Sequence, residues 1–232
     1  MFAASKQPGS PSMVEFQREF HLDTRPGEDI ARVARLGHVI TTALYGKFRA
    51  SRQPACEHAY ACTLEALREV SDFALICIAG LHDVLEEGNN VNAEILTEYF
   101  GIEIAMAVIA LTKIKRGKLS QHEAMVLYVA QMRSSNNWRV IFAKLLDCWH
   151  NVLTADDFIV NATSNAERRR ANCYRKTRDY YLPMFRDCRA LILVEHLDAY
   201  DKLVAEIDRI SAKGLSVDQL ELPIPAATSA IA

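Results

Sequence analysis

Four ionisable side chains occur within the short segment 82–87. His82 and Asp83 follow the apolar stretch 73–79, and Glu86 and Glu87 come three residues later. Helical periodicity would place each of the first two residues on the same face as the glutamate four positions later. Buried charges persist only when they are paired or bound to a metal ion. An adjacent histidine and aspartate offer a nitrogen and an oxygen to one cation, which leaves both glutamates for proton transfer.

Two further residues extend this pair to a candidate set of metal ligands. His58 begins the preceding predicted helix, and Asp147 lies in the otherwise apolar segment 139–149. One histidine and one aspartate cannot hold a divalent ion in water, because protein sites normally supply three or four ligands. Two histidines and two aspartates suit Mn, Fe, Co or Zn better than Ca or Mg. Such a mononuclear site keeps positions open for water and substrate, as hydrolysis requires.

The segments around these residues resemble a known family. The chain reads GLHDVLEE at 80–87, where the family reads LLHDVVED, and RVIFAKLLDCWHNVLT at 139–154, where it reads RV-LIKLADRLHNMRT. Residues 49–59 and 100–114 match two further motifs, and 176–185 is a fainter match. In this order, over about residues 30–190, the motifs resemble the HD-domain phosphohydrolases and, more closely, the hydrolase domain of the RelA/SpoT family.

The resemblance implies an all-α HD-domain helical bundle with a hydrolase activity. The implied reaction removes the 3′-pyrophosphate of guanosine tetra- or pentaphosphate (ppGpp, pppGpp), giving GDP or GTP and pyrophosphate. It implies one divalent metal ion as cofactor, typically Mn²⁺ in this family. The roles implied by position are metal binding for His58, His82, Asp83 and Asp147, orientation and deprotonation of water for Glu86 and Glu87, and nucleotide contacts for Arg49, Ser51, Asn151 and Thr154.

The helix predicted around Asp147 agrees with these roles on its own periodicity. Asp147, Asn151 and Thr154 are spaced i, i+4 and i+7, so they share one helical face. Lys144 precedes Asp147 by three residues, shares that face, and is expected to meet phosphate. His150 is expected to pack or to form a hydrogen bond rather than to bind the metal.

The chain departs from the family motifs at several positions. Ala50 replaces a lysine, so one basic contact is missing unless Arg52 or Lys47 supplies it. Glu87 replaces an aspartate, which keeps the charge but moves the carboxylate by about 1 Å. We expect these changes to reduce or re-tune activity rather than abolish it. The other departures are Ala59 for a proline and Cys148 for an arginine.

Two alternatives remain open at this point. The first is an HD phosphohydrolase of another nucleotide, such as a 2′- or 3′-phosphorylated cofactor, and the change at Ala50 is the reason to keep it. The second is a nucleotide-sensing module that binds without turnover, for which Glu87 is the only support.

Helices must position these residues, since no segment alternates with the period of a strand. Asn92, Ser120 and Ser164 are predicted N-caps, with Glu123 completing a capping box, and Pro183 is predicted to end a helix. We expect a hydrolase domain over 14–214, between a disordered segment 1–13 and a loose tail 215–232. The predicted helices cover 28–45, 58–71, 72–86, 93–99, 102–112, 121–133, 136–151, 165–181 and 185–212.

The composition limits the partners of the protein. With 27 basic and 29 acidic residues the net charge is -2, so the overall charge of the protein does not attract nucleic acid or an anionic membrane. No apolar run is long enough to span a bilayer. Six cysteines without CxxC spacing indicate reduced thiols in a cytoplasmic protein and argue against a cysteine zinc site. The expected partner is a small guanosine polyphosphate, and the oligomeric state stays open.

Overall fold

The described part of the chain is built from helices. The computed structural model describes residue 19, residue 115 and the ranges 27–70, 72–113, 117–161 and 164–215. In the range 27–70, side chains are described from residue 31 onward. Within these ranges strand pairing is limited to one isolated bridge between Phe48 and Pro54. The predicted all-α fold is confirmed. The α-helices are α2 (Gly27–Ala43), α3 (Ala55–Glu69), α4 (Phe73–Leu81), α5 (Val84–Glu87), α6 (Ala93–Phe100), α7 (Ile102–Leu111), α8 (Gln121–Ser134), α9 (Trp138–Leu153), α10 (Asp157–Val160), α11 (Ala166–Lys176), α12 (Leu182–Asp187) and α13 (Leu197–Gly214).

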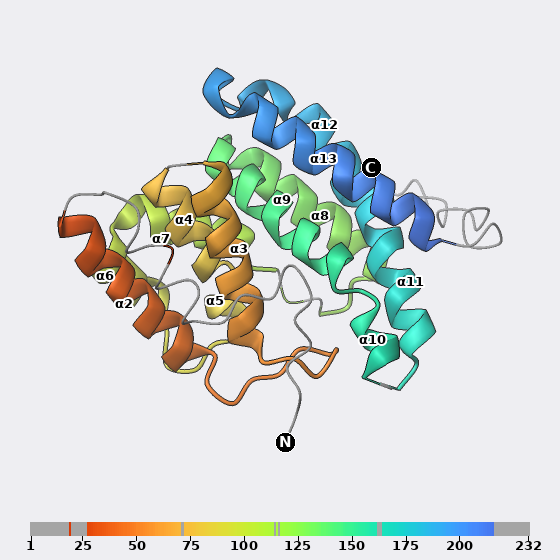
Figure 1. Ribbon diagram of the computed structural model, residues 1–232, viewed down its shortest axis with the longest axis horizontal. Helices are drawn as coiled ribbons and strands as arrows, with labels where there is room; N and C mark the ends of the chain where they lie inside the picture. The colour runs from red at the N-terminus through yellow and green to blue at the C-terminus, as the bar shows by residue number, and fades with distance from the viewer. Residues whose placement is uncertain are drawn as a thin grey trace.

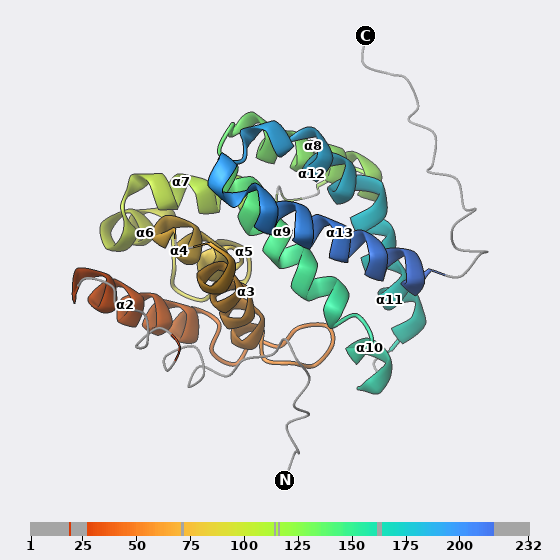
Figure 2. The ribbon, with the colours of Figure 1, turned by 45° about the horizontal axis from the view of Figure 1, so that its top comes forward.

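Helix α9 lies at the centre of the bundle. It contacts α3, α4, α7 and α8, and on the other side α11 and α13 (Figures 1 and 2). Every residue from Val140 to His150 is buried, and a helix that is apolar around its whole circumference is stable only inside a core. The central position of α9 therefore places its few polar side chains, Asp147 among them, in the interior.

The helix predicted over 72–86 is broken at the chemically important residues. Helix α4 ends at Leu81, and α5 begins at Val84. The His82 imidazole Nδ1 donates to the carbonyl of Ala79 at 2.7 Å, which is the acceptor that the backbone N–H of Asp83 would use in a continuous helix. The prediction of one continuous helix over 72–86 was therefore wrong, but Asp83 and Glu87 still share one helical turn, since the N–H of Glu87 donates to the Asp83 carbonyl at 2.9 Å.

The predicted helix caps are correct at two of three positions. Asn92 accepts from the N–H of Ile95, and Ser120 forms the full capping box with Glu123. The cap at Ser164 was wrong, because α11 is preceded by Asn165 in a left-handed conformation without a side-chain cap. The carbonyl of Ser164 instead accepts from the Arg169 guanidinium at 3.0 Å.

Pro183 does not end a helix, contrary to prediction. Helix α11 continues through a π-helical turn, η1 (Thr177–Tyr181), directly into α12, where Pro183 occupies the first turn. The π-helical turn lies directly before the proline, which lacks an N–H, and changes the hydrogen-bond pattern there: the N–H of Leu182 donates to the Thr177 carbonyl, five residues back. The helix predicted over 185–212 is also divided, since the short 3₁₀ turns η2 (Arg189–Leu191) and η3 (Val194–His196) separate α12 from α13.

The predicted ends of the chain lie largely outside the described residues. All of the disordered segment 1–13 does so, and of the tail 215–232 only Leu215 is described, with 6% of its surface exposed. No helix within the described ranges is long and apolar enough to cross a membrane.

One ion pair ties the start of α4 to the start of α9. The Arg139 guanidinium donates to both Asp72 carboxylate oxygens, at 2.8 and 2.7 Å. Asp72 also caps α4 by accepting from the N–H of Leu75 at 2.7 Å. Burial opposes ionisation of Asp72, but these donors hold its pKa below the usual range. The residue thus orients the two helices that carry the site.

We predict that Asp72→Ala lowers the free energy of unfolding by about 2 kcal/mol, since it removes a cap and a bidentate ion pair. Asp72→Asn keeps a capping oxygen and should cost about half as much. Because the folded pKa is depressed, the contribution is present above the unfolded pKa of about 3.9 and is lost as pH falls through the folded value. Urea titrations at pH 7 and pH 3 measure the difference in the free energy of unfolding between wild type and Asp72→Asn. An equal difference at both pH values would contradict the prediction.

Candidate active site

Four ligand-type atoms from three segments converge in the interior. His58 Nε2 lies 3.0 Å from Asp147 Oδ1, 3.2 Å from His82 Nε2 and 4.0 Å from Asp83 Oδ2. His82 Nε2 lies 3.2 Å from Asp83 Oδ2 and 3.7 Å from Asp147 Oδ1. Ligands about 2.1 Å from a shared ion are about 3.0 to 3.4 Å apart in octahedral or tetrahedral geometry. Three of the five separations, at 3.0, 3.2 and 3.2 Å, match this spacing, and the other two, at 3.7 and 4.0 Å, are wider. The structure thus brings together all four residues predicted to bind one divalent metal ion, and the chemistry of their donor atoms suits such an ion.

Both histidines have their second ring nitrogen engaged. His82 Nδ1 donates to the Ala79 carbonyl, which leaves Nε2 directed at the other three donor residues. His58 Nδ1 lies 2.8 Å from Nδ1 of His150, which is fully buried. Partners of this kind fix the tautomer and the ring orientation of metal-binding histidines.

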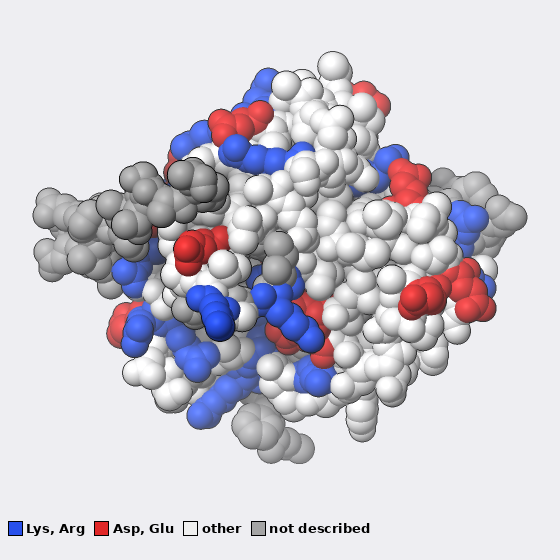
Figure 3. Space-filling view, turned by 180° about the vertical axis from the view of Figure 1, so that it is seen from behind, with Lys and Arg blue, Asp and Glu red and all other residues white. Residues whose placement is uncertain are grey.

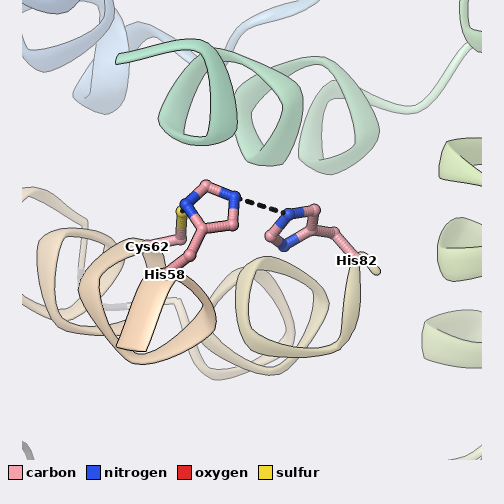
Figure 4. A group of neighbouring side chains, drawn as sticks. All are labelled: His58, Cys62 and His82. Carbon is pink, nitrogen blue, oxygen red and sulfur yellow. Dashed lines mark hydrogen bonds between the residues drawn. The ribbon is translucent and has the colours of Figure 1, made fainter. Parts of the chain in front are cut away.

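Cys62 adds a sulfur next to His58. Its Sγ lies 3.9 Å from His58 Nδ1, whereas His82 faces Nε2 (Figure 4). The three residues form a compact group, since one donor atom of each lies within 4.8 Å of the others. Burial, and next the charge of Asp147, raise the pKa of the thiol well above its usual range. Cys62 is therefore a neutral neighbour of the four-residue set, and all six cysteines are free of disulfides.

A buried lysine compensates the charge of Asp147. Lys144 Nζ donates to Asp147 Oδ2 at 2.6 Å, and Asn151 donates to Oδ1 at 2.5 Å. Burial opposes ionisation of Asp147, but the Lys144 charge and the His58 hydrogen bond hold its pKa well below the usual range. Burial likewise opposes the charge of Lys144, yet Asp147 raises its pKa. The lysine ammonium also lies 4.4 Å from the centre of the Tyr181 ring.

The two carboxylates draw positive charge into the site. Burial, together with the Arg49 charge, lowers the pKa of His58 to about 4, so this ring is neutral at pH 7. Burial also opposes protonation of His82, but Asp83 and Asp147 raise its pKa to about 9. The environment of His82 therefore favours a cation at this position.

A cavity of about 460 Å³ opens above these donors. Asp83, Asp147 and His58 contribute to its lining, as do Glu87 and all five predicted nucleotide contacts, whereas His82 and Glu86 do not. The predicted contacts in the lining are Arg49, Ser51, Lys144, Asn151 and Thr154.

The loop before α3 supplies one wall of the cavity. The Arg49 guanidinium donates to Asn151 Oδ1 and, at 3.2 Å, to Thr154 Oγ1, so the loop residue and the α9 residues form one group. Ser51 Oγ is buried in this wall without a hydrogen-bond partner among the described residues. A buried hydroxyl of this kind calls for a ligand or water. Neither Arg52 nor Lys47 lines the cavity, so the prediction that one of them replaces the missing lysine at Ala50 lacks support.

The two glutamates have different surroundings. Glu86 forms an ion pair with Lys113, with Nζ at 2.8 Å from Oε1. Glu87 lines the cavity, where desolvation and then the charges of Asp83 and Glu86 raise its pKa. A carboxylate with a raised pKa beside a candidate metal site is the better proton acceptor of the two.

Helix α11 contributes cavity residues that the sequence interpretation missed. Arg169, Asn172, Cys173 and Lys176 line the cavity. Their spacing of three and four residues places them on one helical face, but only tertiary packing brings that face to the cavity. Burial, and next the charges of Lys113 and Lys144, lower the pKa of Lys176, which indicates that the cavity gathers cations.

The cavity has a cationic lining overall. Its basic residues are Arg49, Lys113, Lys144, Arg169 and Lys176, against the acidic residues Asp83, Glu87 and Asp147. On one face of the molecule Lys and Arg side chains also gather beside a few acidic ones (Figure 3). Cations beyond those needed to balance the carboxylates favour a polyanionic ligand.

Comparisons with known proteins agree with the sequence resemblance. No protein-family model matches the chain. It is 33% identical over 119 residues to a GTP pyrophosphokinase of Myxococcus xanthus, which covers 49% of the chain and 15% of that protein. It is 31% identical over 140 residues to a probable guanosine-3′,5′-bis(diphosphate) 3′-pyrophosphohydrolase of Synechocystis sp., covering 59% of the chain and 17% of that protein. The chain thus spans less than a fifth of either relative.

A solved structure shares the fold over nearly its whole length. It is a metazoan ortholog of SpoT that hydrolyses ppGpp and plays a role in starvation responses. The match has a TM-score of 0.57 and 19% identity, and it covers 79% of this chain and 99% of the other. The resemblance to the RelA/SpoT hydrolase domain is confirmed.

We predict that Mn²⁺ stabilises the protein by binding the four donors. An ion present at 100 times its dissociation constant should add about 2.7 kcal/mol to the free energy of unfolding. His82→Ala removes one donor and should abolish the gain, whereas Glu86→Gln, outside the donor set, should keep it. Thermal melts with Mn²⁺ and with chelator measure both; an equal gain in His82→Ala and wild type would contradict the site.

Proposed function

We propose that the protein is a metal-dependent hydrolase of guanosine tetra- and pentaphosphate. Water attacks the phosphorus attached to the ribose 3′-oxygen, the bond between them breaks, and pyrophosphate leaves with GDP or GTP as the second product. The observation that carries this proposal is the convergence of four donor atoms beneath a cavity with surplus cations. The similarity to a probable 3′-pyrophosphohydrolase and to a ppGpp-hydrolysing structure supports the same reaction.

We assign metal binding to His58, His82, Asp83 and Asp147. A divalent ion held there would polarise a phosphoryl oxygen and lower the pKa of a bound water. Mixed imidazole and carboxylate donors suit Mn, Fe, Co or Zn, and among these we propose Mn²⁺ because the resemblance to the RelA/SpoT hydrolase domain implies it.

Glu87 is the proposed general base in this reaction. It lines the cavity beside Asp83, and its raised pKa lets it accept a proton from the attacking water. Glu86 orients the site through its ion pair with Lys113, which holds an ammonium group at the cavity. The 3′-oxygen takes up a proton as the pyrophosphate leaves, so the proton balance closes on the ribose hydroxyl.

The proposed nucleotide contacts form two groups in the cavity lining. Arg49, Ser51, Asn151 and Thr154 form one wall, where the unpartnered Ser51 hydroxyl is free to bind a ligand oxygen. Arg169 and Lys176 of α11 form the other. Lys144 forms an ion pair with Asp147 and, as a residue of the cavity lining, also offers its ammonium group to the phosphates. A substrate with phosphate groups at both its 5′ and 3′ positions suits two cationic walls.

We further propose that this chemistry takes place in the cytoplasm, in a domain covering 14–214. Six free cysteines support a reducing compartment. The proposed partner is the small-molecule nucleotide itself.

We predict that the purified protein with Mn²⁺ releases pyrophosphate from ppGpp and that chelator stops the release. Asp83→Ala should abolish turnover, because it removes a donor to the ion, while Asp201→Asn on the exposed face of α13 should leave it unchanged. Chromatography of the products on a panel that includes 2′- and 3′-phosphorylated cofactors measures specificity. Full turnover by Asp83→Ala would overturn the mechanism.

The same panel tests the alternatives. Release of orthophosphate from a phosphorylated cofactor, without pyrophosphate from ppGpp, would identify another phosphohydrolase. Near-zero turnover that rises in Glu87→Asp would identify a sensing module in place of an enzyme.

We predict that Lys176→Ala raises the KM for ppGpp about tenfold, because a charge-assisted contact to phosphate contributes about 1.4 kcal/mol. Its kcat should change little, since Lys176 is neither one of the four donor residues nor the proposed general base. Lys202→Ala, which removes an exposed lysine paired with Glu69, is the matched control. Steady-state kinetics measure both; an unchanged KM in Lys176→Ala would remove α11 from the substrate site.

A further inference from the structure

Helix α9 contacts both nitrogens of the His58 ring. Asp147 Oδ1 lies 3.0 Å from Nε2, and His150 Nδ1, one turn further along α9, lies 2.8 Å from Nδ1. The His58 and His150 rings are 4.8 Å apart between centres and tilted by 49°, so the contact is through the nitrogens and not through stacked faces. One helix thus sets both the position and the rotation of an imidazole that belongs to another helix, α3.

A neutral imidazole carries a single N–H. If His58 Nε2 is to donate its lone pair to a cation, the proton must reside on Nδ1 and needs an acceptor there. For His82 that acceptor is the Ala79 carbonyl at 2.7 Å. For His58 the candidate acceptors are His150 Nδ1 at 2.8 Å and the Cys62 sulfur at 3.9 Å. Only the His150 nitrogen lies within the usual distance of an N–H hydrogen bond.

We propose that His150 is a positioning residue that accepts the Nδ1 proton of His58 and thereby directs His58 Nε2 to the metal ion. The assignment rests on the metal site of the proposed function and goes beyond it, because His150 is itself no ligand. It requires His150 to hold its own proton on Nε2. His150 is fully buried, which favours a fixed tautomer over exchange with water.

Two amide substitutions separate this role from packing. In His150→Asn the amide oxygen occupies about the place of Nδ1 and can accept from His58, whereas in His150→Gln the polar atoms lie about where Nε2 was. We expect Mn²⁺ affinity within about threefold of wild type for His150→Asn and a loss of about 10- to 100-fold for His150→Gln. Cys62→Ala, on the same side of His58, should stay within about threefold.

Isothermal titration of each metal-stripped full-length variant with Mn²⁺ gives the affinities without any substrate. Thermal melts in chelator show which variants fold, and His150→Phe, which fills the space without an acceptor, replaces His150→Gln if that variant does not fold. Equal affinities in the Asn variant and the acceptor-free variant would overturn the proposal. Wild type that binds no Mn²⁺ would overturn it together with the metal site, whereas tight wild-type binding without ppGpp hydrolysis would contradict only the substrate.

Discussion

The burial of the Asp147 charge on the central helix is the constraint on which the rest of the site depends. A carboxylate in a core persists only with partners that compensate it. Lys144 and Asn151 provide two of these from the same helix, and His58 Nε2 of α3 lies 3.0 Å from the carboxylate. The same contacts bring the histidine nitrogen to the donor cluster, so the arrangement that makes Asp147 tolerable in the core also assembles the candidate metal site.

The break between α4 and α5 is the second requirement. Because the His82 side chain takes the Ala79 carbonyl, the chain turns at Asp83 and brings its carboxylate within 3.2 Å of His82 Nε2. A continuous helix would have kept adjacent side chains about 100° apart around its axis. The turn also gives the two glutamates separate tasks, since Glu87 lines the cavity while Glu86 is paired with Lys113.

The sequence predicted the helical class and the convergence of His58, His82, Asp83 and Asp147, because residue type and periodicity carry that information. It could not predict the helix break at His82, which depends on a side chain competing for a backbone carbonyl. The continuation through Pro183 was missed because a π turn leaves no local signal. Lys176 was missed because only tertiary packing brings α11 to the cavity. The sequence thus identified the candidate metal ligands, whereas only the structure showed that α11 lines the cavity.

The most direct test of the account is anomalous diffraction at the manganese edge from crystals grown with Mn²⁺. The account predicts one peak about 2.0 to 2.3 Å from His58 Nε2, His82 Nε2, Asp83 Oδ2 and Asp147 Oδ1. A peak bound instead by Cys62 and His58 Nδ1, or no peak at these four atoms in a fully loaded crystal, would contradict it.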